Sequence, residues 1–304
     1  MRNSPSQGFP MRLHAIFLDA TLGTVLQTAN WPTDSRWSRL IAAHDGMFVT
    51  QRGELLTLYD AKLNSIKSIR LPIFSSGENW KAVASATGKS ILFIPDSMEG
   101  DSWLWVRTDD LKLLRQWQDK RDGWVSISDD RIAMVKCGWQ FDCNPELETR
   151  SLDSGWAHIA SVTHRAVPRF LGSGKFAVFD SSSGSIDIFS REGKQTDTLT
   201  GLNHPCWWET MGLSSDGRYL VVPNCKTKGK MPAFDISGKV LLEAVSVFRL
   251  PLEAAGSLLK LGGPKIEGFT QMAISPNGSK LAILNNESIE LFDLHTSVSG
   301  PLPH

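Results

Sequence analysis

Cysteine is the residue type in this sequence whose spacing could support the most specific chemistry. The two cysteines of KCGWQFDC lie in a C-x5-C arrangement, with no histidine nearby. This spacing differs from the C-x2-C of zinc ligands and dithiol redox centres, which leaves those two readings weak. We therefore expect two local disulfides, with four reduced thiols as the main alternative. The expected pairs are Cys137–Cys143 and Cys206–Cys225.

The second cysteine pair flanks the turn LSSDGR. A four-residue loop over 214–217 would set Cys206 directly opposite Cys225 on two antiparallel strands. A two-residue Asp-Gly loop would instead make them diagonal neighbours on the same face. Both arrangements allow a disulfide, which would indicate an oxidising compartment.

The first ten residues, MRNSPSQGFP, point to a different compartment. They contain no apolar segment of the kind that marks a signal peptide. As written, the chain is expected in the cytoplasm. If its natural start lies upstream, a periplasmic or secreted location follows, in agreement with the disulfides.

Signals for catalysis are weak throughout the sequence. The seven histidines are scattered, and HExxH, GxSxG, GxGxxG and GxxxxGK[ST] do not occur. His204, in NHPCWW beside Cys206, is the histidine most worth following, although a packed or solvated side chain is the simpler interpretation. We expect no metal and no cofactor.

Charge and hydropathy restrict the partners. The sequence has 32 basic and 32 acidic residues, which gives no general attraction to nucleic acid or to an anionic membrane. The longest apolar runs, such as AIFL and ILFI, are far shorter than the roughly 20 residues of a membrane-spanning helix. We expect a monomer that binds a protein segment or a small ligand.

A repeat organises the elements that must position these residues. A turn followed by an apolar strand recurs at Gly46, Gly88, Asp130, Gly174, Gly217 and Gly278, with spacings of 42, 42, 44, 43 and 61 residues. Each turn follows a short alternating segment and precedes two or three more strands. Third strands are expected at LLTLYD, LWVRTD, LETRSL, IDIFS, SVFRL and IELFDL. Four short antiparallel strands in 40–45 residues are typical of a β-propeller blade.

The fold expected is all-β, a single propeller of seven four-stranded blades with an incomplete first blade. Residues 14–28 resemble a third and a fourth strand without the first two. The long 61-residue interval predicts an inserted hairpin near CKTKGKMPAFDISGKVLLEA. We place a disordered tail at 1–10, the propeller at 11–297 and a second tail at 298–304. Six blades, or a ring left open because the chain begins inside a blade, are the alternatives.

The segments SPNGSKLAIL, SSDGRYLVV and FLDATLGTVL resemble the YVTN and WD-repeat-like β-propeller superfamily. From about residue 11 onward, the chain is similar to uncharacterised bacterial propeller proteins with the same WP, HDG, SDDRIA and SPNGSKLA signatures. This resemblance implies a fold but no chemistry. It also implies an export signal and further N-terminal strands.

Two sets of residues are candidates for a binding face. Aromatic residues near the start of the first strands could ring the channel mouth or pack between blades: Trp37, Trp80, Trp124, Trp208 and Phe269. Acidic residues in the loops between second and third strands could converge on one side, or could simply be solvated: Asp96, Glu99, Asp101 and Asp142. His204 belongs to the same predicted face.

These observations favour a non-catalytic interaction module that presents a polar, Trp-rimmed face to a protein segment or small ligand. The alternative is a hydrolase or lactonase of the propeller type, with its site at the central channel. Such a site would be assembled from distant blades and would leave no local motif.

Overall fold

A computed structural model describes most strands of the chain and the turns between many of them. The described residues are 11–18, 25–33, 38–72, 80–95, 102–121, 123–136, 144–162, 166–171, 174–180, 185–200, 212–214, 219–225, 227–228, 231–232, 242–249, 259–262, 265–268, 270–275, 279–285 and 288–293. They belong to two compact units: residues 1–84 with 88–119, and residues 85–87 with 120–304.

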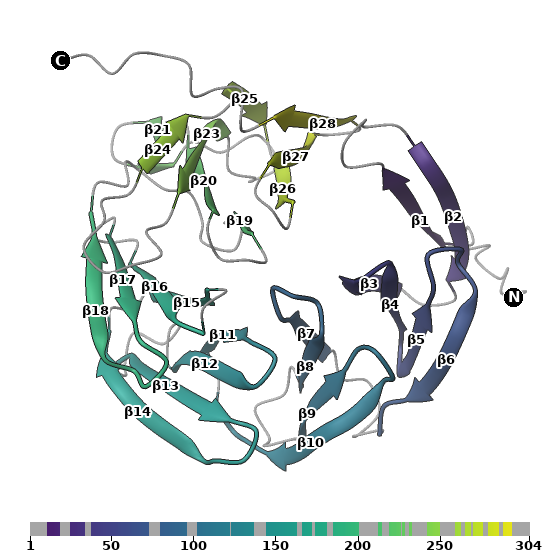
Figure 1. The fold of residues 1–304 in the computed structure, drawn as a ribbon, viewed down its shortest axis with the longest axis horizontal. Coiled ribbons are helices and arrows are strands. Elements are labelled where there is room, and N and C mark those ends of the chain that lie inside the picture. Colours follow the sequence, from purple (N-terminus) through teal and green to yellow (C-terminus); the bar gives the residue numbers. More distant parts are fainter. Residues whose placement is uncertain are drawn as a thin grey trace, which may run out of the picture. The chain divides into compact units, whose positions relative to one another are not determined.

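The first unit contains one hairpin and two four-stranded antiparallel sheets (Figure 1). The hairpin pairs β1 (Met11–Leu18) with β2 (Val25–Thr33). In each sheet the strands pair in chain order. The first sheet is β3 (Ser38–His44), β4 (Met47–Arg52), β5 (Leu55–Tyr59) and β6 (Ser65–Arg70). The second is β7 (Trp80–Ala84), β8 (Ser90–Pro95), β9 (Ser102–Arg107) and β10 (Lys112–Gln118).

The core of the first unit lies between these two sheets. Leu56 and Leu58 alternate along β5, and Leu104 and Val106 alternate along β9. All four belong to one buried cluster, since residues two apart in a strand project from the same face. Burial of this apolar face, at roughly 25 cal/mol per Å², is what holds the two sheets together.

The second unit continues the pattern. One sheet is β11 (Gly123–Ile127), β12 (Arg131–Lys136), β13 (Glu146–Ser151) and β14 (Trp156–Ser161). The next is β15 (Ala166–Phe170), β16 (Phe176–Asp180), β17 (Ser185–Phe189) and β18 (Gln195–Leu199). A third joins β19 (Gly212–Leu213), β20 (Tyr219–Cys225), β23 (Leu242–Arg249) and β24 (Leu259–Gly262), and β25 (Lys265–Gly268) also pairs with β23.

Two smaller sheets complete the described part of this unit. One has three strands, β26 (Thr270–Ile274), β27 (Lys280–Asn285) and β28 (Ser288–Asp293). The other is a hairpin of β21 (Thr227–Lys228) and β22 (Met231–Pro232). This hairpin lies between β20 and β23 in the chain, which confirms the predicted insertion.

Each apolar cluster of the second unit combines side chains from two consecutive sheets. Ala133 and Leu147 pack with Phe176 and Phe189 across the first pair of sheets. Similar clusters join the second sheet to the third, and the third to the three-stranded sheet. Stacking of successive antiparallel sheets, each contacting its neighbours, is the packing of propeller blades.

The turn motif of the repeat has a simple physical basis. At the first repeat, Asp45 and Gly46 form the two-residue turn with φ of 46° and 75°, as a type I′ hairpin requires. At later repeats, a serine hydroxyl accepts the backbone N–H that opens the next strand. Arg131 N–H donates to Ser128, Tyr219 N–H to Ser214 and Lys280 N–H to Ser275, at 3.0, 3.0 and 2.9 Å.

The predicted strand order is confirmed where the structure describes it. The six expected third strands correspond to β5, β9, β13, β17, β23 and β28, and residues 14–28 contribute to the β1–β2 hairpin. The described residues contain five complete blades, one from each of the sheets with four or more strands. Seven blades therefore stay a prediction.

The fourth strands of the four complete chain-order sheets share one irregularity. The register of each shifts by one residue against the third strand, at Ile66, Leu114, Ile159 and Thr196. Such β-bulges disturb the free edge of a sheet and discourage pairing with another chain. In the described part of the chain, there is no helix with the length and apolar character needed to cross a bilayer.

Candidate functional site

Most residues predicted for the binding face lie outside the described residues. These are Trp37, Trp208, Phe269, Asp96, Glu99, Asp101, Asp142 and His204, and with them Cys137, Cys143 and Cys206. Trp80 lies on β7 and Cys225 on β20, where the backbone alone is described. The convergence of the acidic loops and the disulfides therefore stay predictions.

Trp124 is the one predicted face residue whose side chain the structure describes. It lies on β11, is half-buried, and packs against both apolar clusters that flank β15–β18. This is the inter-blade position that we considered as the alternative to a binding rim. At this blade the aromatic residue serves to pack consecutive sheets.

The register beside Cys225 agrees with one of the two predicted pairings. Leu213 lies opposite Leu220, and Ser214 N–H donates to the carbonyl of Tyr219 at 3.0 Å. The strand pair therefore has the register in which residues 206 and 225 would be diagonal rather than direct partners.

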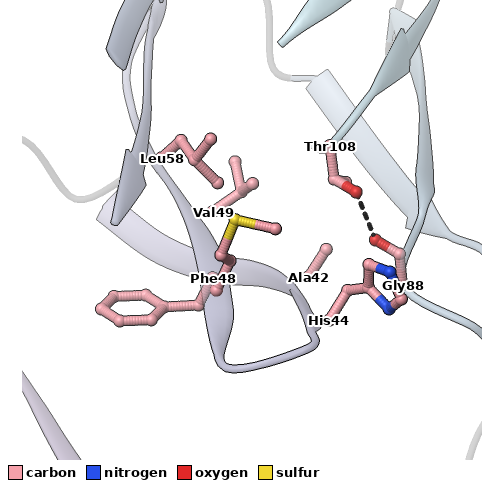
Figure 2. A pocket seen from close by; sticks show the side chains of 8 residues that line it. Ala42, His44, Phe48, Val49, Leu58, Gly88 and Thr108 are labelled. Atoms are coloured by element: carbon pink, nitrogen blue, oxygen red, sulfur yellow. Dashed lines mark hydrogen bonds between the residues drawn. The ribbon is translucent and has the colours of Figure 1, made fainter. Parts of the chain in front are cut away.

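The described polar groups gather at the turns between first and second strands and between third and fourth strands. In the first unit, His44 Nε2 lies 3.0 Å from Asp45 Oδ2 and 3.9 Å from Asp109 Oδ1. Thr108 Oγ1 donates a 2.8 Å hydrogen bond to the Gly88 carbonyl (Figure 2). The contact between His44 and Asp109 joins the turns of two consecutive blades, and the Thr108–Gly88 hydrogen bond joins two turns of one blade.

A small pocket lies beside His44. It is lined by Ala42, His44, Met47, Phe48, Val49, Leu58, Gly88 and Thr108, and most of this lining is apolar (Figure 2). The pocket has no room for a water molecule. It is therefore a packing gap between turns and not a ligand site.

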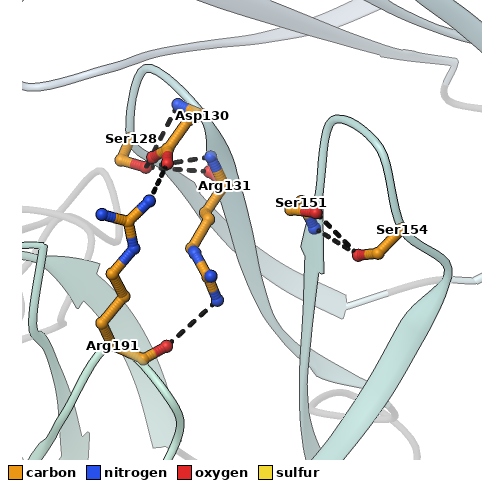
Figure 3. Close-up of polar contacts among 6 residues, drawn as sticks. All are labelled: Ser128, Asp130, Arg131, Ser151, Ser154 and Arg191. Atoms are coloured by element: carbon orange, nitrogen blue, oxygen red, sulfur yellow. Dashed lines mark hydrogen bonds and ion pairs between the residues drawn. The ribbon is translucent and has the colours of Figure 1, made fainter.

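In the second unit, the corresponding turns are joined by arginines (Figure 3). Arg191 Nη2 lies 2.5 Å from Asp130 Oδ2, and Arg131 Nη1 donates to the Arg191 carbonyl at 3.0 Å. Ser128 Oγ donates to Asp130 Oδ1 at 2.9 Å. The carboxylate of Asp130 is thus held by its own turn and by the next blade.

A second contact between turns occurs earlier in the chain. Ser85 Oγ and Thr87 Oγ1 both donate to Asp129 Oδ1 at 2.7 Å. Because the hydroxyls and the carboxylate lie on successive turns of the second unit, these hydrogen bonds also tie turn to turn. A charged acceptor strengthens each of them.

A partly buried ionic cluster surrounds β13. Arg121 Nε lies 2.8 Å from Glu148 Oε2, and the two side chains are 33% and 10% exposed. Arg121 also lies over the Trp156 ring at 5.1 Å, and Arg150 lies 6.0 Å from the same ring. Because Glu148 is nearly buried, removing its arginine would leave a carboxylate short of a counter-charge.

Asp110 is the described carboxylate with the largest electrostatic perturbation. Hydrogen bonds from Arg107, at 3.0 and 2.6 Å, lower its pKa from an ordinary 3.8 to about 2. The backbone N–H of Lys112 and the charge of Lys67 act in the same direction. The largest cause, the hydrogen bonds from Arg107, lies within the same turn, so the lowered pKa has a structural explanation.

The described polar groups, taken together, hold turns in place. No group of three or more His, Cys, Asp or Glu side chains suited to a metal ion occurs among the residues with described placement. Sequence reasoning missed these turn contacts, although the Asp-rich turns SDD and TDD that supply several of them are visible in the sequence.

Comparison with known proteins supports the fold. No family model and no curated protein sequence matches the chain. Solved structures do match. Kluyveromyces lactis Hsv2p has a TM-score of 0.60 at 13% identity, over 94% of this chain and 88% of its own. A functionally unknown protein of Desulfotomaculum acetoxidans has a TM-score of 0.52 at 13% identity, over 83% and 75%.

A third similar structure is KlAtg21, solved in complex with the coiled coil of AgAtg16. It has a TM-score of 0.55 at 10% identity, over 84% of this chain and 80% of its own. Identities this low show the fold alone. The chain is an all-β protein with the β-propeller fold.

Proposed function

We propose that this protein is a non-catalytic interaction module that binds a segment of another protein. The main support for the proposal is that four of the described carboxylates make contacts within the fold. Asp110, Asp129, Asp130 and Glu148 each accept hydrogen bonds or ion pairs that hold turns or strands together. A catalytic carboxylate has to reach a substrate, whereas these are engaged within the framework.

Similar propellers support the choice of partner. KlAtg21 was solved with a coiled coil bound, so one protein of this fold receives a protein segment. We propose the same class of partner here, bound at the face where the loops between second and third strands gather. We further propose seven blades, with β1–β2 and β26–β28 belonging to the two blades beyond the five complete ones.

The proposal is tested by selecting peptides from a displayed library on the purified full-length protein. Peptides that bind the predicted face should lose affinity when Trp37 and Trp208 are both changed to alanine. We expect a loss of tenfold or more, since rigid aromatic side chains are frequent hot spots. The measurement is fluorescence anisotropy with the selected peptides.

Trp156→Ala provides the matched control, because it removes a tryptophan from a fourth strand and not from the predicted face. Its melting temperature should be measured alongside, since Trp156 contacts two arginines. Selection of no peptide above a scrambled library, or equal binding by the Trp37/Trp208 variant, would refute the proposal.

A further inference from the structure

The free edge strands of the first unit carry positive charge, whereas the edge strands of the next two sheets, β14 and β18, contain no lysine or arginine. β6 and β10 are the edge strands of their sheets and contain four cations and no carboxylate: Lys67, Arg70, Lys112 and Arg115. In a chain with equal numbers of basic and acidic residues, such a local excess is not imposed by composition. Within the described part of the chain, Arg70, Lys112 and Arg115 have no carboxylate partner.

Two large apolar side chains are exposed on the same strands. Ile66 is 53% exposed on β6, and Leu113 is 41% exposed on β10. Exposed apolar groups beside unpaired cations form a surface able to bind both charge and hydrocarbon. We refer to Ile66, Lys67, Arg70, Lys112, Leu113 and Arg115 as the basic edge.

The basic edge is continuous across two blades. Lys67 Nζ donates a 2.6 Å hydrogen bond to the backbone carbonyl of Asp110, in the turn that leads into β10. The Arg107–Asp110 ion pair, at 2.6 Å, holds that same turn. Figure 1 shows β6 and β10 as the outermost strands of their two sheets. A ligand laid across both strands would therefore meet a preorganised surface.

Edge protection does not account for these cations. Lysine on an edge strand discourages pairing with other chains, as a β-bulge does. However, β14 and β18 carry the same bulge and contain no lysine or arginine. The bulge alone therefore protects β14 and β18 from pairing with other chains. The cations of β6 and β10 must have another role.

We propose that the basic edge is a second docking surface, which binds an acidic protein segment containing interspersed apolar residues. Carboxylates of the segment pair with Arg70, Lys112 and Arg115, and its apolar side chains cover Ile66 and Leu113. The bulges at Ile66 and Leu114 disfavour strand addition, so the segment lies across the two strands and does not extend either sheet. The proposal rests on the proposed function, since it assumes an interaction module.

The test uses a short fluorescent peptide of repeated Glu-Glu-Leu triplets and the full-length protein. The edge variant is R70Q/K112Q/R115Q. The matched control, K120Q/K175Q/K194Q, removes the same charge from the second unit. We expect the edge variant to bind about tenfold more weakly at low salt, the size expected when three exposed ionic contacts are lost together. The control should bind like the wild type, and wild-type binding should weaken as salt is added.

A second variant, I66S/L113S, tests the apolar contribution and should also weaken the peptide. Equal binding by wild type and edge variant, or equal losses in edge variant and control, would overturn the proposal. Phosphatidylserine vesicles serve as a further probe. If the vesicles bind to the basic edge and the peptide does not, the surface recognises lipid and the proposal is wrong. If the wild type binds face-selected peptides but not the Glu-Glu-Leu peptide, this inference alone is refuted, whereas a wild type that binds neither refutes the interaction module.

Discussion

Two glycines with left-handed backbones differ in what surrounds them. Gly53 has a φ of +57°, and nothing lies within 4 Å of an added Cβ. Gly88 has a φ of +74°, and a Cβ there would lie 2.1 Å from the Ala43 carbonyl oxygen. The first position requires glycine for backbone conformation alone, and the second also for the close approach of two blades.

We therefore predict different costs for the same substitution. Gly53→Ala should lower the free energy of unfolding by about 1 kcal/mol, from the left-handed backbone. Gly88→Ala should lower it by ~3 kcal/mol or more, because backbone must also move. Urea unfolding of both variants measures the difference. Equal losses would show that the contact between Ala43 and Gly88 does not constrain the fold.

The lowered pKa of Asp110 predicts that the stability of the folded protein depends on pH. Its pKa is lowered to about 2 by Arg107, so the folded state favours the ionised form. The stabilisation is complete above the ordinary pKa of 3.8 and is lost as the pH falls toward 2. Asp110→Asn should flatten the decline of the urea midpoint between about pH 4 and pH 2. An unchanged slope in the variant would assign the decline to other carboxylates.

Among turns, the serine that accepts the N–H of the following strand is the recurrent feature. Ser214 is fully buried and receives the N–H of Tyr219. Ser214→Ala removes the acceptor while keeping the backbone, so we expect a loss of ~1 kcal/mol or more. The control is Ser65→Ala, at an exposed serine of a fourth strand. Comparable melting temperatures for the two variants would contradict this role for the hydroxyl.

The strands and their turns are the level at which sequence reasoning worked best. The place of LLTLYD and LWVRTD after the repeated turn and second strand predicted β5 and β9, because four short antiparallel strands recur in every blade. The Asp-Gly pair at 45–46 predicted a hairpin because it accepts positive φ. The bulges at Ile66 and Thr196 were not predicted, since an extra residue in a fourth strand depends on how that edge is paired.

For the chain as a whole, the cysteines provide the test that bears on compartment. We predict that Cys137–Cys143 and Cys206–Cys225 form in protein exported to an oxidising compartment. The smaller ring would stabilise the fold by roughly 2 kcal/mol. Intact mass after thiol alkylation, with and without reduction, measures the free thiols. Complete alkylation of the folded, exported protein before reduction would disprove both pairs.

The sequence by itself determined the repeat, the strand order, the inserted hairpin and the all-β class, because turn residues and two-residue alternation act over a few neighbouring positions. Only the tertiary structure decided which turns meet. Arg191 lies 61 residues from Asp130, and Asp129 lies 44 residues from Ser85, yet each pair is in contact. It also decided that Trp124 packs between blades. Such contacts arise from the stacking of one sheet on the next, which no local spacing encodes.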